Sequence, residues 1–213
     1  MSKRHLPIIL GIVLLSLASL RAASAALEDL PGIQDAASLR DWLKLTDDQV
    51  AKLDPVITTR IEKVDAALLV VENAEEPDLL GFIEEYGKIR KEFDAGVAHI
   101  LTPDQAKQWE AFKVELEKEL VAAGAGRKLR EMQPALHLTD EQVTKLQPAM
   151  GTALQGKVDV LQKLADGGRI SPRDKMKAKR SMGNIDDELE KAMSTVMSPD
   201  QLEGYKALTA KKK

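Results

Sequence analysis

The stretch LKLTDDQVAKLDP at residues 43–55 returns as LHLTDEQVTKLQP at residues 136–148, with nine of thirteen positions identical. Thr46 suits a helix N-cap because its hydroxyl can accept a hydrogen bond from a free backbone N–H of the first turn. The side chain of Gln49, three residues later, can accept one from the N–H of Thr46, which completes a capping box. Asp47 and Asp48 suit the positive end of the helix dipole. The phrase therefore predicts a helix start, written twice.

Two variants of the phrase, LTPDQ at residues 101–105 and MSPDQ at 197–201, predict two further helix starts. They carry proline at the first helical position, where its missing N–H costs nothing. Plain and proline-containing starts recur at a spacing of 93 to 96 residues, which indicates an internal duplication. We favour helix capping over a polar ligand site for these side chains. The predicted capping pairs are Thr46 with Gln49, Thr102 with Gln105, Thr139 with Gln142, and Ser198 with Gln201.

Apolar residues follow each start at steps of three and four, the spacing that places them on one face of a helix. The sequence therefore predicts an all-α fold of two tandem helical-hairpin repeats, each with three to four helices in coiled-coil-like packing. Pro55 and Pro148 fall at matching places inside predicted helices, where proline bends the axis. The predicted segments are a signal peptide (1–25), a first repeat (26–121), a linker (122–127) and a second repeat with a basic tail (128–213).

The first 25 residues have the features of a secretory signal. A basic start precedes an apolar run from Leu6 to Leu20, and Ala23-Ser24-Ala25 offers small residues for cleavage. An uncleaved membrane anchor is the alternative, but fifteen residues are fewer than the roughly 20 that a membrane span needs. The pattern predicts a periplasmic or secreted protein, cleaved near Ala25, with no transmembrane segment in the mature chain.

Charge and composition argue against nucleic-acid binding and against catalysis. The chain has 31 basic and 34 acidic residues, and loss of Lys3, Arg4 and Arg21 with the signal leaves 28 against 34, a net charge of −6. Nucleic-acid binding needs a net basic surface. Only two histidines follow the signal, there is no cysteine, and no phosphate-binding loop is present. We predict no enzyme, no cofactor and no metal site.

One segment, residues 169–180, stands out because it holds six basic residues and one acidic residue. The matching part of the first repeat, at residues 75–78 and 84–85, is acidic instead. A solvated surface, an anionic envelope surface, and an electrostatic match between the halves or between two chains are all compatible with this difference. We treat the six as a candidate client-binding basic patch, formed by Arg169, Arg173, Lys175, Lys177, Lys179 and Arg180.

The paired starts behind a secretory signal resemble the LTXXQ-motif periplasmic proteins, the Spy/CpxP-like family. The resemblance covers about residues 36–121 and again 128–210. It rests on Leu-Thr-x-x-Gln at residues 45–49, 101–105 and 138–142, with a degenerate copy at 197–201. The resemblance implies a helical-hairpin cradle whose concave face holds unfolding clients without ATP, with possible roles in envelope-stress signalling or metal tolerance. This chain carries two units in one polypeptide and lacks the histidine and cysteine wealth of a metal-binding member.

These observations favour an exported, ATP-independent chaperone or envelope-stress binding protein. One alternative is a regulatory or metal-responsive sensor domain that acts on a membrane partner, and another is a structural or adaptor protein of the envelope. The expected partners are unfolded or partly folded envelope proteins, or a membrane sensor protein. A monomeric pseudo-dimer and a homodimer both fit the duplicated sequence.

Overall fold

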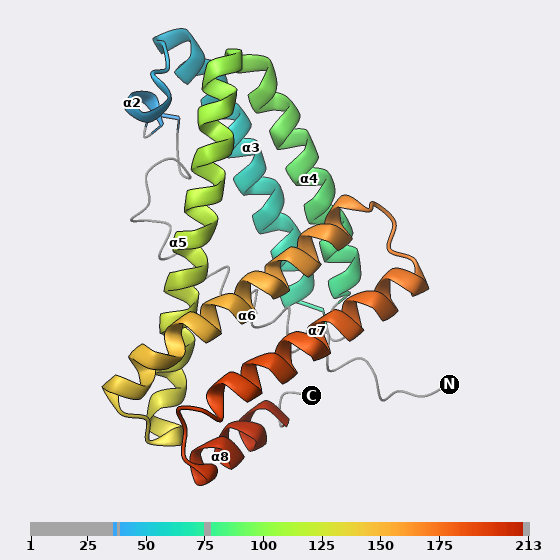
Figure 1. Cartoon of the computed structure of the whole chain (residues 1–213). Helices are drawn as coiled ribbons and strands as arrows, with labels where there is room; N and C mark the ends of the chain where they lie inside the picture. Colours follow the sequence, from blue (N-terminus) through green and yellow to red (C-terminus); the bar gives the residue numbers. More distant parts are fainter. Residues whose placement is uncertain (1–35, 38, 75–77, 211–213) are drawn as a thin grey trace. The chain divides into compact units, whose positions relative to one another are not determined.

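The computed structural model describes residues 36–37, 39–74 and 78–210, and within them the chain is all-α without strands (Figure 1). This confirms the predicted fold class. The signal peptide predicted for residues 1–25, residues 75–77 with their two glutamates, and the lysine tail at 211–213 lie outside the described residues. The described helices are α2 (Arg40–Leu43), α3 (Asp47–Glu72), α4 (Leu79–Ile100), α5 (Pro103–Leu136), α6 (Asp140–Asp166), α7 (Pro172–Met193) and α8 (Pro199–Ala210).

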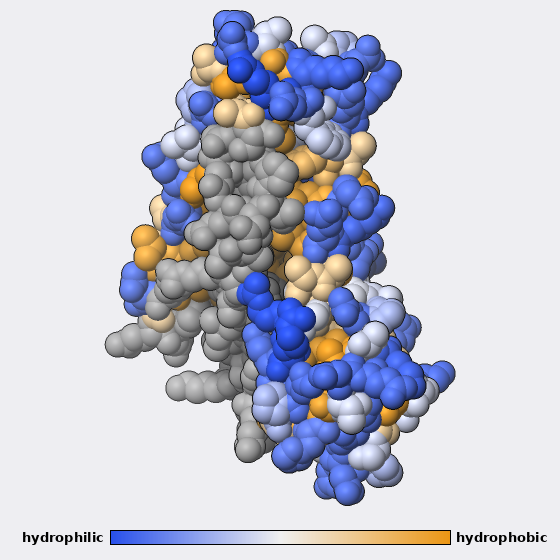
Figure 2. All heavy atoms as spheres, turned by 90° about the vertical axis from the view of Figure 1, so that its left-hand side faces the viewer, coloured by the Kyte–Doolittle hydropathy of each residue, from blue (hydrophilic) through white to orange (hydrophobic). Residues whose placement is uncertain are grey.

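None of these helices combines the length and the apolar character that crossing a bilayer requires, within the part of the chain that the structure describes. Hydrophilic residues instead cover much of the surface, with hydrophobic residues showing in patches between them, as one face of the molecule illustrates (Figure 2). This pattern is the one expected of amphipathic helices that bury one face each.

The chain divides into two compact units, and the division does not fall at the predicted linker. The N-terminal unit holds the described residues up to Leu116 together with Ala165–Arg169, and the C-terminal unit holds Glu117–Leu164 and the described residues from Ile170 onward. Residues 122–127, the predicted linker, lie inside the continuous helix α5. Two glycines weaken a helix by about 1 kcal/mol each relative to alanine. Burial of Ala125 in the core of the C-terminal unit helps to offset that cost.

The core of the N-terminal unit forms where α3 packs along α4 and the start of α5 joins them (Figure 1). Leu53 and Ile57 from α3 are exposed by only 1% and 2%, because they stand four residues apart on one face. Phe93 from α4 packs edge-on against Trp109 from α5, with ring centroids 6.1 Å apart. The apolar spacing in the sequence therefore becomes the buried face of each helix.

The core of the C-terminal unit uses the second half of α5 together with α6, α7 and α8. Leu129, Leu146 and Met193 are exposed by at most 1%, and they come from α5, α6 and α7. Tyr205 from α8 is also buried in this cluster. Pro148 lies inside α6 as Pro55 lies inside α3, and the bends predicted at these prolines stay a prediction.

Candidate functional site

All four predicted helix starts carry the hydrogen bonds of an N-cap. Thr46 Oγ1 accepts from the backbone N–H of Gln49 at 3.3 Å, and Gln49 Oε1 accepts from the backbone N–H of Thr46 at 3.1 Å. The same two bonds recur at the starts of α5, α6 and α8, in the pairs Thr102 with Gln105, Thr139 with Gln142, and Ser198 with Gln201.

The glutamines of these caps also bond to each other, which sequence reasoning did not foresee. Gln49 Nε2 donates to Gln105 Oε1 at 2.7 Å, and Gln105 Nε2 donates to Gln49 Oε1 at 3.1 Å. In the C-terminal unit, Gln142 Nε2 donates to Gln201 Oε1 at 2.9 Å and the return bond measures 3.2 Å. We call each reciprocal pair a glutamine bridge. Each bridge joins two helix starts that lie 56 or 59 residues apart in sequence.

Each bridge extends to backbone carbonyls at the ends of two other helices. In the N-terminal unit, Gln49 Nε2 donates to the carbonyl of Ile100 at 3.0 Å, and Gln105 Nε2 donates to the carbonyl of Leu43 at 3.1 Å. Ile100 ends α4 and Leu43 ends α2, where carbonyls lack partners within the helix. The four glutamines of the two bridges are all partly buried. A bridge is therefore a node that fixes two helix starts and two helix ends together.

The C-terminal unit has the same extension. Gln142 Nε2 donates to the carbonyl of Val196 at 3.0 Å, and Gln201 Nε2 donates to the carbonyl of His137 at 3.0 Å. The donors and acceptors of each glutamine are thus used by the protein itself. The repeated phrase therefore has a structural role, and the candidate binding surface lies elsewhere in the chain.

Two residues beside the bridges have the left-handed backbone conformation, which favours glycine. Lys44 has φ 51° and His137 has φ 50°, and both follow directly on the last residue of a helix, α2 or α5. The next residue donates its N–H across this turn, from Leu45 to Arg40 and from Leu138 to Gln133. The turn brings the carbonyls of Lys44 and His137 within 3.2 Å and 3.0 Å of a bridge amide. A side chain with a Cβ atom is strained here.

Replacing these two residues by glycine is therefore expected to stabilise the protein. Both side chains are exposed, and relief of the left-handed strain favours Lys44→Gly and His137→Gly by about 0.5–1 kcal/mol each. Urea unfolding followed by circular dichroism measures the change. Ala123→Gly, in the exposed middle of α5, is the matched control and should instead destabilise by about 1 kcal/mol. A loss of stability in both test variants would contradict the strain argument.

Five residues of the candidate basic patch lie on helix α7, and the sixth lies outside this helix. Arg173, Lys177 and Arg180 share one side of α7 with Met176, at helical steps of three and four, and all four are exposed. We call these four residues the α7 stripe. Lys175 and Lys179 are exposed beside it, whereas Arg169 lies in the connection before α7 and is exposed there. Met176 is 68% exposed.

The cations on α7 make no salt bridge with a described residue. The ion pairs that α7 makes use its acidic residues, with Lys157 bound to Asp186 at 2.6 Å and Lys206 bound to Glu190 at 2.7 Å. The one acidic group among the cations is Asp174, which accepts from the backbone N–H of Ser171 and closes a capping box. Hydrogen bonds from Ser171 lower the pKa of Asp174, and the nearby cations lower it further.

Local physics disfavours this placement of positive charge. The helix dipole repels cations near an N-terminus, and each unfavourable position costs about 0.3–1 kcal/mol. Arg173 and Lys177 form a like-charge pair four residues apart, as do Lys175 and Lys179, and each pair costs a few tenths of a kcal/mol. The first turns of α3, α5, α6 and α8 instead carry only acidic charge. The cations on α7 therefore weaken their own helix.

Apolar side chains add little to the surface around the cations of α7. Met182 is 7% exposed and belongs to the buried face of α7, together with Leu189 and Met193. Only Met176 adds apolar surface among the cations. Its position follows from helical spacing, because it lies on the side of α7 opposite to the buried residues.

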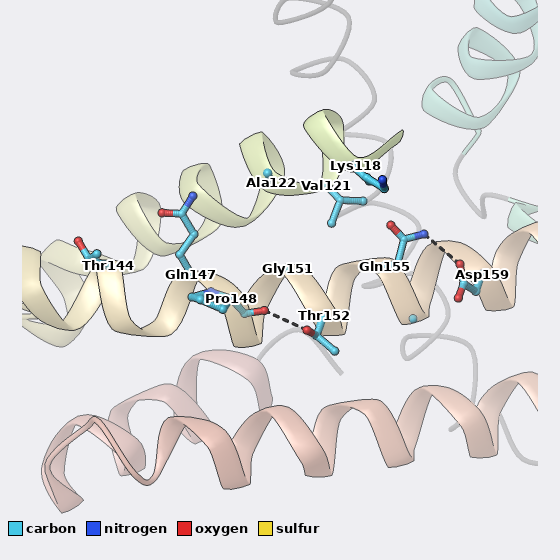
Figure 3. Close-up of a pocket in the computed structure, with 11 residues that line it drawn as sticks. Lys118, Val121, Ala122, Thr144, Gln147, Pro148, Gly151, Thr152, Gln155 and Asp159 are labelled. Carbon is cyan, nitrogen blue, oxygen red and sulfur yellow. Dashed lines mark hydrogen bonds between the residues drawn. The ribbon is translucent and has the colours of Figure 1, made fainter. Parts of the chain in front are cut away.

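A shallow groove lies between α5 and α6 in the C-terminal unit (Figure 3). Its volume is about 700 Å³ and its lining is mostly apolar, with Val121 and Ala122 on the α5 side and Pro148 on the α6 side. Gly151 has open space around it, so no side chain fills the groove there. Gln155 closes one end through a 3.0 Å hydrogen bond to Asp159. The groove can receive apolar side chains, and two charged residues, Lys118 and Asp159, also line it.

The described residues contain no cluster of three or more His, Cys, Asp or Glu side chains arranged to hold a metal ion. His99 lies near the end of α4 and His137 in the turn after α5, in different units. The resemblance to the LTXXQ-motif proteins stays a prediction drawn from the sequence. No protein-family model, no curated protein and no solved structure matches this chain.

Proposed function

We propose that this chain is an exported binding protein that holds unfolding proteins of the cell envelope without using ATP. The observation that carries the proposal is the α7 stripe, an exposed row of three cations without ion-pair partners among the described residues, with an exposed methionine among them. The signal-like N-terminus and the resemblance to the LTXXQ-motif proteins support the same function. The absence of a phosphate-binding loop from the sequence fits binding without nucleotide.

The proposed mechanism has an electrostatic step followed by an apolar step. Cations without partners attract the acidic segments of an unfolding protein over a distance set by ionic strength, about 10 Å at 0.1 M salt. Met176 then contacts apolar side chains, and its flexible thioether adapts to different partners. The groove beside α6 provides a second apolar surface within the same unit. Binding of this kind is weak, broad in specificity and reversible.

An aggregation assay with the mature chain, residues 26–213, tests the proposal. We expect suppression of client aggregation at near-stoichiometric amounts without nucleotide, and weaker suppression as salt rises from about 50 mM to 500 mM. The triple variant R173E/K177E/R180E should lose most of the suppression at low salt. The control K52E/K107E/K145E makes the same change of net charge at exposed lysines on α3, α5 and α6. Equal suppression by wild type and the α7 variant at low salt would contradict the proposal.

A further inference from the structure

We propose that the α7 stripe also docks the protein on an anionic lipid bilayer. In this arrangement Arg173, Lys177 and Arg180 contact lipid phosphates, and Met176 enters the headgroup layer. The inference uses the same surface as the proposed function but does not require that the protein binds clients. It identifies a partner of stated chemistry, a surface of lipid phosphate groups.

The energetics of α7 point to a partner outside the chain. Arg173 lies in the first turn, at the positive end of the helix, and it repels Lys177 at a spacing of four residues. None of the three cations makes an ion pair with a described residue. Their favourable contact within α7 is with Asp174, whose pKa Lys177 and Arg173 help to lower. A negatively charged partner would turn each of these penalties into an attraction, because the helix dipole and the cations then act together.

The side chains fit phosphate groups in particular. Two of the three cations of the stripe are arginines, whose planar guanidinium groups donate two parallel hydrogen bonds to a phosphate. The stripe runs from Arg173 to Arg180, about 10 Å along the helix axis. All three cations are exposed, and long basic side chains can follow a surface of headgroups without a fixed register.

The form of the surface favours a bilayer over a folded protein that docks through a fitted interface. The stripe lies on the outer side of α7 and contributes no residue to the groove between α5 and α6. A protein partner gains most of its affinity from apolar anchors that fill pockets, and the stripe supplies one exposed methionine. A charged planar surface needs no such complementarity. Charge therefore carries the fit, and charge complementarity with anionic headgroups is what the stripe offers.

Two features limit the contact to the periphery of the bilayer. The apolar face of α7, with Met182, Leu189 and Met193, is buried within the protein and cannot turn toward lipid. The C-terminal half of the helix carries acidic residues, including the exposed Asp187 and Glu188. We therefore expect the N-terminal half of α7 to touch the membrane and the other half to be held away. Binding should be reversible by salt.

Vesicle sedimentation tests this inference with the mature chain. We expect binding to vesicles that contain phosphatidylglycerol, none to vesicles of phosphatidylcholine alone, and release at high salt. The variant R173E/K177E/R180E should bind at least roughly 100-fold more weakly, since removal of three cations removes three such contacts. K52E/K107E/K145E, with the same net charge, should bind nearly as wild type. Equal binding of both variants, or binding to phosphatidylcholine, would overturn the assignment.

Two further measurements distinguish lipid binding by the stripe from misfolding of the variant and from an acidic protein partner. Thermal unfolding of the α7 variant should give a melting temperature close to that of wild type, because all three side chains are exposed and make no ion pair with a described residue. A lower melting temperature with loss of helical signal would mean that misfolding removed the binding. Vesicle binding by the single variant R180E would then test the stripe. Soluble polyglutamate should compete more weakly than anionic vesicles at equal total charge, and competition as strong as that by anionic vesicles would assign the stripe to acidic protein segments instead.

The aggregation assay keeps this inference distinct from the proposed function. If the stripe serves both, then anionic vesicles should reduce client protection by wild type, because membrane and client compete for one surface. Vesicle binding without any client protection would support the inference and contradict the proposed function. Client protection without vesicle binding would do the reverse.

Discussion

Replacing Gln49 with glutamate is expected to lower the free energy of unfolding by about 2–3 kcal/mol, although glutamate is a common residue at this position of a capping box. The carboxylate keeps the acceptor that the N–H of Thr46 uses, and its charge suits the helix dipole. It cannot donate, however, so the bonds that Gln49 Nε2 donates to Gln105 Oε1 and to the carbonyl of Ile100 are lost. Those two acceptors then face a negative charge in a partly buried site.

This substitution separates the two roles of the glutamine. If Gln49 only caps α3, glutamate should leave stability unchanged or raise it by a few tenths of a kcal/mol. If the glutamine bridge holds the unit together, glutamate should destabilise it. Gln108→Glu, at an exposed position on the same helix as Gln105, is the control for the added charge and should change stability by less than about 0.5 kcal/mol. Urea denaturation gives both values.

A double-mutant cycle with Gln105 measures the bridge itself. Gln49→Ala and Gln105→Ala each remove one partner, and the coupling between them should be about 1–2 kcal/mol because the two amides contact each other directly. Additive effects of the two substitutions would show that the bridge contributes nothing beyond the two caps.

The capping residues were predictable from the sequence, and the glutamine bridges were not. Capping depends on residues three positions apart, so the letters of Thr46 and Gln49 are enough to suggest it. The bridge depends on Gln49 and Gln105 meeting across 56 residues, which requires the packing of α3, α4 and α5. A signal did exist, because glutamine was repeated at all four starts where glutamate would cap equally well. A residue that both donates and accepts is needed for a reciprocal bond.

The linker and the basic patch show why local composition misleads. Glycines at 124 and 126 suggest a break, yet packing of Ala125 and Leu129 into the core keeps α5 helical through them. Met182 lies on the apolar face of α7 and is buried, whereas Met176 is exposed. In the sequence, only the positions of the two methionines around the helix axis distinguish them. Charge near α7 was visible in the sequence. Whether acidic residues pair with these cations depends on which described residues lie within hydrogen-bonding distance. Only the tertiary structure shows this.

The second large effect is expected from Leu53→Ala and Leu146→Ala, two buried leucines that lie 93 residues apart. Each is 1% exposed, on α3 and α6 respectively, and each lies in the main apolar cluster of its own unit. Leucine-to-alanine changes in a closed core cost about 3–4 kcal/mol, because apolar contacts are lost and a cavity remains. Both variants should show this loss in chemical denaturation.

The exposed Val114→Ala on α5 is the control, and it should change stability by less than about 0.5 kcal/mol, since Val114 is 55% exposed. A comparison of the two leucine variants also tests the duplication inferred from the sequence. Equal losses of stability at Leu53 and Leu146 would mean that matching residues of the two repeats occupy equivalent packing environments. A large loss of stability at one leucine and a small one at the other would show that one core relaxes to fill the cavity. The repeated phrase would then not impose the same packing on both units.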